Sequence, residues 1–377
     1  MKKFVLIPDS FKGTLSSIEV CKVMENAIKK HFTNAQVLSI PVADGGEGSV
    51  DCFLSCLGGE KVFVNCKNPY MQDMVGFYGV IDGGKTAIIE MSASAGLPLV
   101  ENNKSPLKTT TYGVGEIVLD ALNKGVKKII MGLGGSCTND FGAGMAYALG
   151  VRFFDEKNNS FMPVGESLSR VKKIDLTNKT PLLNGVEIIT MCDIDNPPYG
   201  KSGASYVFAP QKGASDSDIV LLDNGVKNIC DVYLKDYGVD LSTLKGGGAA
   251  GAMGAGMVAF FNSTLKMGIE TVLDTVDFTN KIKDATVIFT GEGKIDGQSL
   301  RGKVVIGVAR KAKELNVPVI SVVGGADGDI DGAYQQGVTS VFTINKLPQD
   351  FSISKHNSKE NLAFTMDNIL RTLKAFN

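Results

Sequence analysis

The stretch ATVIFTGEGKIDGQSLRGKVVIGVARKAKEL, residues 285–315, contains a complete strand, loop and helix. Its apolar start, residues 285–290, is typical of a strand buried on both faces of a parallel sheet. Its end, residues 303–315, has the spacing of a helix. The loop between them, residues 290–303, interleaves four glycines with five charged residues. A solvated turn does not need that mixture, so we predict a loop that faces a ligand.

The two ends of the chain repeat this unit. Residues 3–8 are a continuous apolar run, and the helix that follows begins at a capping box formed by Ser16 and Glu19. A second strand, an acidic glycine loop and a helix from about Ser49 come next. In the C-terminal part, strands are predicted at 317–325 and 340–344 and helices at 331–337 and 359–376. This alternation predicts one doubly wound parallel sheet built from both chain ends.

The middle of the chain has a different pattern. Residues 60–92 contain strands joined by turns with no helix between them, which favours antiparallel pairing. We therefore predict an α/β protein of two domains: a Rossmann- or flavodoxin-like domain at 1–60 plus 281–377, and an inserted α+β domain at 61–280. The two chain crossings predict a cleft between the domains.

Composition narrows the class of protein. Of 377 residues, 44% are apolar and 21% charged, and the net charge of −1 argues against a nucleic-acid partner. The seven cysteines have no paired spacing, so we expect reduced, mostly buried thiols in a cytoplasmic protein. Only His31 and His356 are present, which argues against a Ser-His-Asp triad.

One uncharged stretch needs a separate interpretation. Residues 246–265 carry no charge but contain six glycines, so they are too weakly apolar to cross a bilayer. We predict a glycine loop that runs into a buried helix, and no membrane partner.

Loops at the predicted strand ends share a composition of glycines with carboxylates or lysine. Ligands of open α/β sheets bind outside the carboxyl ends of the strands, and glycine-loop amides bind phosphate oxygens. Carboxylates hold Mg²⁺ or accept a proton, and lysine offsets phosphoryl charge. Together these groups favour a phosphotransferase. The loops lie at residues 9–13, 44–48, 134–140, 193–197, 246–248 and 290–303.

Named nucleotide motifs are absent or incomplete. Gly200-Lys201-Ser202 resembles the end of a P-loop, but Asp195 stands where that motif needs glycine. No Gly-x-Gly-x-x-Gly follows the first strand, which weakens the alternative of a dinucleotide-dependent oxidoreductase. A non-catalytic phosphosugar-binding protein is a second alternative, although it would not need so many carboxylates.

Taken together, the loops resemble the signature blocks of the type-1 family of bacterial glycerate kinases. The blocks follow the family order and span nearly the whole chain: DSFKGTLSS (9–17), PVADGGEGS (41–49), IEMSASAGLPLV (89–100), TTTYGVGE (109–116), GLGGSCTNDFGAGM (132–145), CDIDNPPYG (192–200), GGGAAGAMGAG (246–256) and TGEGKIDGQSLRGK (290–303). Two positions, Pro198 and Cys137, depart from the family pattern, and neither removes a catalytic group.

The resemblance implies transfer of a phosphoryl group from ATP to D-glycerate. It also implies a flavodoxin-like domain and a restriction-enzyme-like insert, and ATP and Mg²⁺ as the cofactors. Both the 2- and the 3-hydroxyl of glycerate stay candidates for the acceptor, and the oligomeric state stays open.

Site residues were assigned from loop position and residue chemistry. The predicted catalytic residues are Lys12, Asp44, Asp193, Lys294 and Asp296, of which Asp193 and Asp296 also are the predicted Mg²⁺ ligands. The predicted substrate- or phosphate-binding residues are Ser10, Gly45, Gly46, Gly134, Gly135, Ser136, Asn139, Asp140, Asn196, Gly246, Gly247, Gly248, Gly291, Glu292 and Arg301.

Overall fold

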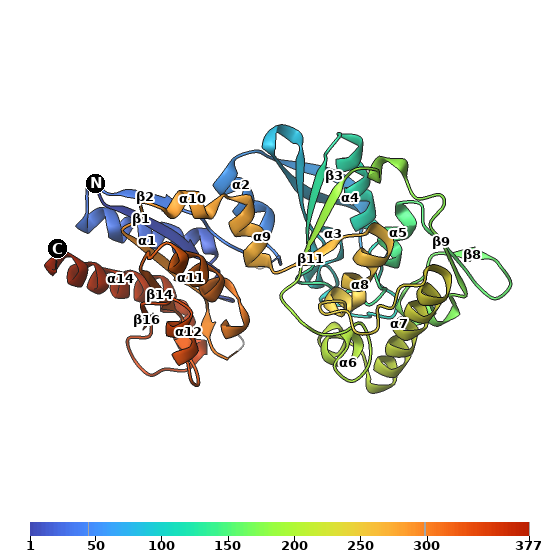
Figure 1. Cartoon of the computed structure of the whole chain (residues 1–377). Coiled ribbons are helices and arrows are strands. Elements are labelled where there is room, and N and C mark those ends of the chain that lie inside the picture. The colour runs from blue at the N-terminus through green and yellow to red at the C-terminus, as the bar shows by residue number, and fades with distance from the viewer. Residues whose placement is uncertain (44, 298, 377) are drawn as a thin grey trace. The chain divides into compact units, whose positions relative to one another are not determined.

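The computed structural model describes residues 1–43, 45–297 and 299–376, with the backbone alone at residue 301. The chain forms two compact units (Figure 1). Unit 1 comprises Met1–Asp44, Asp51–Leu57 and Met267–Asn377, and unit 2 comprises Gly45–Val50 and Gly58–Lys266. The domain boundaries predicted from the sequence, 1–60 plus 281–377 and 61–280, stay a prediction.

Unit 1 contains a parallel sheet of five strands in the order β16-β14-β12-β1-β2. The two chain ends therefore share one sheet (Figure 1), and the strand order places β1 between β12 and β2. The strands are β1 (Lys3–Pro8), β2 (Gln36–Ser39), β12 (Val287–Gly291), β14 (Val319–Val323) and β16 (Ser340–Thr343), and a two-stranded pair is formed by β13 (Lys294–Ile295) and β15 (Gly325–Ala326).

Helices cover both faces of this sheet. Phe4 and Leu6 of β1 pack with residues of α1 and α14, while the alternate residues Val5 and Ile7 point to the other face and are also fully buried. Helix α11 contacts β1, β12 and β14. The doubly wound arrangement predicted from the sequence is thus confirmed. The helices are α1 (Ser17–His31), α9 (Gly268–Thr275), α10 (Phe278–Ile282), α11 (Val304–Glu314), α12 (Asp331–Gln335), α13 (Phe351–Ser354) and α14 (Ser358–Ala375), and α2 (Ser49–Leu57) has residues in both units.

Local sequence signals account for the start of α1. The side chain of Ser16 accepts a hydrogen bond from the Glu19 amide, and the Glu19 carboxylate accepts one from the Ser16 amide at 2.9 Å. This is the predicted capping box, which satisfies two amides that the first helical turn leaves without a partner. The helix ends at His31, whose imidazole pairs with Asp367 at 2.7 Å rather than with a nucleophile.

Unit 2 contains a mixed sheet of six strands in the order β11-β10-β6-β5-β4-β3. Strands β11, β10, β6 and β5 are parallel, whereas β3, β4 and β5 pair antiparallel, as residues 60–92 predict. The strands are β3 (Glu60–Lys67), β4 (Asp73–Ile81), β5 (Thr86–Glu90), β6 (Lys128–Gly132), β10 (Glu187–Met191) and β11 (Thr264–Lys266), with a separate three-stranded sheet of β7 (Arg152–Phe154), β8 (Ser160–Phe161) and β9 (Lys173–Asp175).

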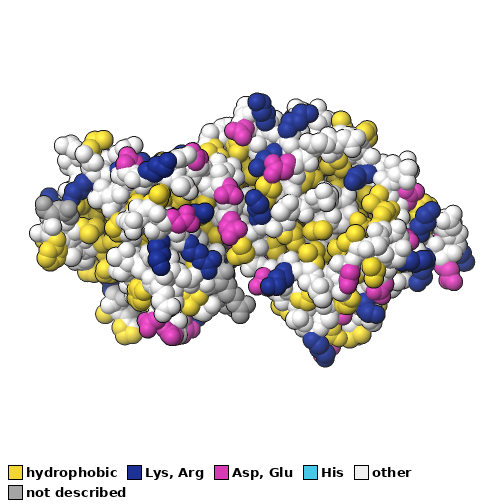
Figure 2. All heavy atoms as spheres, in the orientation of Figure 1, with side chains coloured by type: hydrophobic (Ala, Val, Ile, Leu, Met, Phe, Trp, Pro, Cys, Tyr) yellow, Lys and Arg dark blue, Asp and Glu magenta, His cyan; other side chains and the backbone are white. Residues whose placement is uncertain are grey.

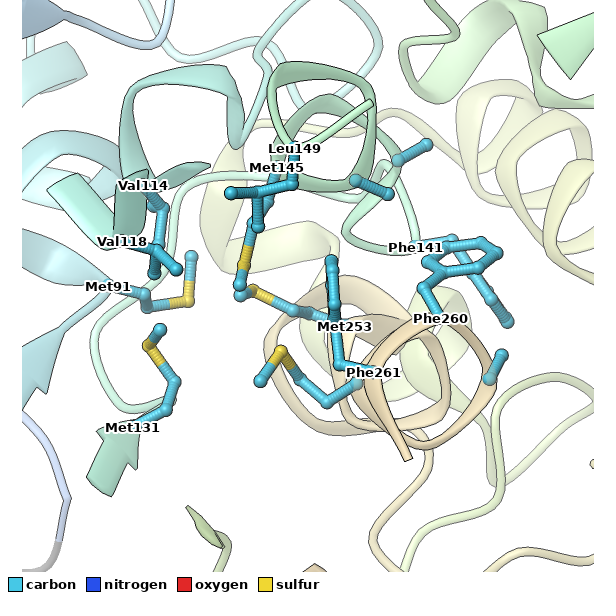
Figure 3. Close-up of a cluster of buried hydrophobic side chains, with 14 of the residues drawn as sticks. Met91, Val114, Val118, Met131, Phe141, Met145, Leu149, Met253, Phe260 and Phe261 are labelled. Carbon is cyan, nitrogen blue, oxygen red and sulfur yellow. The ribbon is translucent and has the colours of Figure 1, made fainter. Parts of the chain in front are cut away.

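Several methionines lie in the core of unit 2. Met91, Met131, Met145 and Met253 lie among valine, leucine and phenylalanine side chains between the sheet and the helices (Figure 3). Their unbranched side chains fit irregular gaps between elements. The helices are α3 (Ser92–Ala95), α4 (Tyr112–Asn123), α5 (Ala143–Ala148), α6 (Ala204–Phe208), α7 (Asp216–Tyr237) and α8 (Ala249–Phe261).

Helix α8 confirms the interpretation of the glycine-rich stretch as a loop leading into a buried helix, since most of its residues are buried. Among the described residues, none of the helices has both the length and the apolar character needed to span a membrane. All seven cysteines are free, and all except the half-buried Cys56 are buried. On the face shown in Figure 2, basic and acidic side chains are interspersed.

Candidate active site

A pocket of about 530 Å³ lies at the carboxyl edge of the unit 1 sheet. Strands β1, β12 and β14 are parallel neighbours, so the loops that follow them meet at one edge. The pocket is lined by carboxylates and lysines from these loops together with apolar and amide side chains: Asp9, Ser10, Phe11, Lys12, Thr14, Glu292, Lys294, Asp296, Lys303, Ile344, Asn345, Gln349 and Phe351.

Five of the residues predicted to form the site line this pocket, namely Ser10, Lys12, Glu292, Lys294 and Asp296. Two other predictions for this unit fall outside the description: Asp44 is not among the described residues, and nothing is described of the Arg301 side chain.

Gly291, the last residue of β12, has a packing explanation. A Cβ atom there would lie 2.0 Å from the carbonyl oxygen of Val322 on the neighbouring strand. Only glycine fits at that distance, so sheet packing by itself accounts for this glycine.

Glu292 has the most unusual environment of the pocket carboxylates. The residue is 6% exposed, and its Oε1 atom has no hydrogen-bond partner among the described residues. Burial raises the pKa of Glu292 to about 7, and the negative charges of Asp9 and Asp296 act in the same direction. A carboxylate with a free buried oxygen and a pKa near neutrality is suited to accept or release a proton.

The other two predicted residues of this loop are held by neighbours. Lys294 Nζ lies 2.6 Å from Oδ2 of Asp327, so part of its charge is already offset. Oδ1 of Asp296 accepts a hydrogen bond from the Ser299 amide at 3.2 Å, and the Asp296 amide donates to the Ser299 hydroxyl. These contacts fix the loop and orient the Asp296 carboxylate at the pocket wall.

Unit 2 has a corresponding edge, where the loops after the parallel strands β5, β6 and β10 meet. Gly134, after β6, donates its amide to the carbonyl of Gly45 at 2.9 Å. A Cβ atom on Gly134 would lie 2.5 Å from the Cα of Gly46. The described part of the predicted loop at 44–48 is therefore in direct contact with the predicted loop at 134–140, and glycine is required at position 134 for that approach.

One backbone amide of this loop, that of Gly135, has no hydrogen-bond acceptor among the described residues. Gly135 is exposed and has φ of +76°. Amides in a tight turn of this kind form anion-binding sites. Ser136, next to it, is 8% exposed and pairs with Gly96 in an isolated bridge.

Asp193 follows β10 at the same edge of the sheet and is half-buried. The neighbouring Asn196 is bound within the protein, because its Nδ2 atom donates to the carbonyl of Ser202 at 2.7 Å and its own carbonyl accepts from Gly248.

Several predicted binding residues of unit 2 are engaged within the protein. Asp140 is fully buried, and its carboxylate accepts hydrogen bonds from the amides of Thr111, Gly142 and Gly144 and from the Thr111 hydroxyl. Asn139 is fully buried and donates to Ser205. This geometry favours a structural role for both.

The glycines at 246–248 are buried as well. The amides of Gly247 and Gly248 donate to the carbonyls of Leu244 and Asn196. A Cβ atom on Gly248 would lie 2.4 Å from the carbonyl oxygen of Pro197. Close packing accounts for these glycines, and the amides of Gly247 and Gly248 are already bound within the protein.

Comparison with known proteins identifies the family. A model described as the Glycerate kinase family matches residues 4–374. The chain belongs to the glycerate kinase family. As a member of it, the protein is an enzyme, a kinase that acts on glycerate, as the sequence predicts. This excludes the oxidoreductase and the non-catalytic binding protein that we considered as alternatives.

Relatives of similar length agree with this assignment. The chain is 41% identical over 372 residues to a glycerate 2-kinase of Escherichia coli K12, and 40% identical over 372 residues to a glycerate kinase of Haemophilus influenzae; both alignments cover 98% of each chain. A crystal structure of a Salmonella typhimurium LT2 protein assigned as glycerate kinase 2 superimposes with a TM-score of 0.87 at 39% identity. That match covers 99% of this chain and 98% of the other.

Against this glycerate kinase fold, sequence reasoning missed two charged residues of the unit 1 pocket. Asp9 directly follows β1 and Lys303 precedes α11, and both line the pocket. Asp9 had a usable signal, because it stands at the carboxyl end of a buried strand. For Lys303 the only sequence signal was its position at the start of a helix, where a lysine is usually solvated.

In unit 2, sequence reasoning missed Lys212. This lysine is 2% exposed, and its Nζ atom donates to Ser136 Oγ and to the Thr138 carbonyl, both at 2.7 Å. No spacing or motif in the sequence connects it to the loop that it contacts.

Proposed function

We propose that this kinase transfers the γ-phosphoryl group of ATP to the 2-hydroxyl of D-glycerate, giving 2-phosphoglycerate and ADP. The observation that carries the proposal is the unit 1 pocket, in which Asp9, Glu292 and Asp296 line the same cavity as Lys12, Lys294 and Lys303. Carboxylates for proton and metal work beside cations for phosphoryl charge are what phosphoryl transfer needs. The choice of the 2-hydroxyl is supported by the similarity to the E. coli glycerate 2-kinase.

In this proposal Glu292 accepts the proton of the attacking hydroxyl. The hydroxyl oxygen forms a bond to the γ-phosphorus, the bond from that phosphorus to the bridging oxygen of ADP breaks, and the proton passes to Oε1 of Glu292. That oxygen is buried, has no partner among the described residues and belongs to a residue that lines the pocket. Lys12, Lys294 and Lys303 offset the negative charge of the transferring group.

We propose Mg²⁺ as the metal ion, with Asp296 or Asp193 as its protein ligand. Their donor atoms are carboxylate oxygens, the type that Mg²⁺ prefers. Among the described residues no group of three or more acidic, histidine or cysteine side chains forms a metal site, which fits an ion that binds through one or two carboxylates and the nucleotide phosphates. Bound there, Mg²⁺ neutralises phosphate charge.

A coupled assay tests the activity. ADP release from ATP and Mg²⁺ is expected to require D-glycerate, and NMR of the product is expected to show phosphorus coupled to the proton on C2. ADP release that does not depend on glycerate rejects the kinase assignment. Coupling to the C3 protons rejects the 2-hydroxyl while leaving the kinase assignment in place.

We also propose a cytoplasmic location. The seven free thiols support it, since cysteines stay reduced in that compartment.

A further inference from the structure

Lys212 is a buried lysine that makes no contact ion pair in the described part of the chain. It ends the short helix η5 (Pro210–Lys212) and is 2% exposed. No carboxylate of a described residue lies within 4.0 Å of its Nζ atom, whereas most buried lysines are paired. Its two hydrogen bonds go to neutral oxygens of Ser136 and Thr138.

The titratable groups that face Lys212 make no direct ion pair with it. Asp140 attracts it, but four donors from Thr111, Gly142 and Gly144 already bind that carboxylate. Cys137 is the other group, and burial raises its pKa to about 12, so it stays a neutral thiol. Neither group forms a direct ion pair with Lys212, although Asp140 attracts it from a distance.

The hydrogen bond from Lys212 determines what Ser136 can do. An ammonium group has no lone pair, so Lys212 is the donor and Ser136 Oγ the acceptor. The hydroxyl proton of Ser136 must then point away from Lys212, and it reaches no acceptor among the described residues. The amide of the exposed residue Gly135 lies next to it in the chain, also without a described acceptor.

We propose that Lys212 is a positioning residue for anion recognition, which holds the loop at 134–138 and turns the Ser136 hydroxyl outward as a donor to an anionic group of a substrate. The anion is the phosphoryl group of the nucleotide or the carboxylate of glycerate, since both accept the same donors. The identity of the ligands rests on the proposed function. The positioning role of Lys212 rests only on the contacts that this lysine makes. Lys212 itself touches no substrate, because its ammonium group is covered.

The environment of Lys212 gives this role a signature in pH. Burial lowers the pKa of Lys212 to about 8. An anion bound at the loop favours the charged ammonium, so binding above that pH draws a proton onto Lys212. Below pH 7 the lysine is already charged and binding takes up no proton there.

Isothermal titration calorimetry of the full-length protein tests the proposal. D-glycerate and ADP are titrated separately at pH 7 and pH 9, each in two buffers of different ionisation enthalpy. For the anion that binds the loop, we expect uptake of about one proton at pH 9 and almost none at pH 7. Lys212→Met is expected to abolish the uptake and to weaken binding of that anion by about 10-fold or more at pH 7. If the variant loses affinity and proton uptake with ADP, the anion bound at the loop is a phosphoryl group. If it loses them with D-glycerate, the anion is the carboxylate.

Three further variants separate positioning from folding. Ser136→Ala leaves the lysine in place and is expected to reduce the affinity for the same ligand to a similar extent. The double variant, Lys212→Met with Ser136→Ala, is expected to bind that ligand no more weakly than the weaker-binding of the two single variants. Lys179→Met is the matched control, because Lys179 is a half-buried lysine of the same unit that donates to the Phe260 carbonyl, and it is expected to bind both ligands normally.

The proposal is overturned if Lys212→Met binds both ligands with unchanged affinity and proton uptake. If Lys212→Met does not fold, unchanged binding by Ser136→Ala overturns it instead. A wild-type protein that takes up the proton with ADP but fails to phosphorylate glycerate would reject the proposed activity and leave the role of Lys212 standing.

Discussion

The Nζ atom of Lys294, a residue that lines the unit 1 pocket, lies 2.6 Å from Oδ2 of Asp327 in an ion pair. Both side chains are more than half exposed, so solvent and salt screen the pair. Asp327→Asn is expected to free the lysine for an anionic ligand and to lower the KM for ATP about two- to fivefold at low salt. The gain should vanish at high ionic strength. An unchanged KM at low salt would show that Lys294 does not contact the nucleotide.

Glu292→Gln keeps the shape of the side chain and removes its ability to accept a proton. We expect kcat to fall by about 10²-fold or more, with a smaller change in KM, since general-base catalysis contributes about that much. Glu314→Gln at the end of α11 is the control, because Glu314 does not line the pocket. A kcat within threefold of wild type would remove Glu292 from the proton transfer.

The same substitution has an effect on stability that depends on pH. The folded-state pKa of Glu292 is raised to about 7, so between pH 4.5 and 7 the folded chain binds more protons than the unfolded chain. The stability that protonated Glu292 contributes is complete below about pH 4.5 and is lost as pH rises through 7. Denaturant unfolding measures the free energy of unfolding of Glu292→Gln and of wild type at pH 5 and at pH 8. The difference, variant minus wild type, should be about 1–3 kcal/mol more favourable to the variant at pH 8 than at pH 5. A constant difference between the two pH values would mean that this carboxyl has an ordinary pKa.

Asp193 and Asp296 follow parallel strands of different units and are both proposed for metal or base work. Asp193→Asn and Asp296→Asn should each reduce kcat by about 10²-fold if the carboxylate does that work. If the substituted carboxylate is a metal ligand, the variant should also require a higher Mg²⁺ concentration than wild type to reach its maximal activity. Titration of each variant with Mg²⁺ separates the two roles, and near-normal turnover in either variant would exclude that residue.

The sequence predicted what depends on neighbours along the chain. The capping box at Ser16 and Glu19, the buried strand at 287–291 and the antiparallel strands of residues 60–92 each follow from a local pattern. The gathering of strand-end loops was predictable too, because parallel strands place their carboxyl ends at one edge.

Contacts between distant residues were not predictable. Lys212 lies 76 positions from Ser136, and Asp327 lies 33 positions from Lys294. No pattern marks either pair. Asp140 was predicted to bind a ligand because it lies in a glycine-rich loop. Nothing in the neighbouring sequence shows that the amide and hydroxyl of Thr111 donate hydrogen bonds to its carboxylate.

Asp140 allows a direct test of whether a predicted binding residue has a structural role instead. Its carboxylate is fully buried and connects the start of α5 to the segment before α4 through hydrogen bonds. Asp140→Asn replaces one acceptor oxygen with a donor that faces other donors, so we expect the free energy of unfolding to fall by about 2–4 kcal/mol. Because the side chain is not directed at a ligand, kcat and KM of the folded enzyme should stay within about threefold of wild type. Asp155→Asn is the matched control: Asp155 also accepts from two backbone amides but at an exposed turn, and its loss should cost under about 1 kcal/mol. A stable Asp140→Asn variant with a KM for glycerate or ATP raised tenfold would return this residue to the binding site.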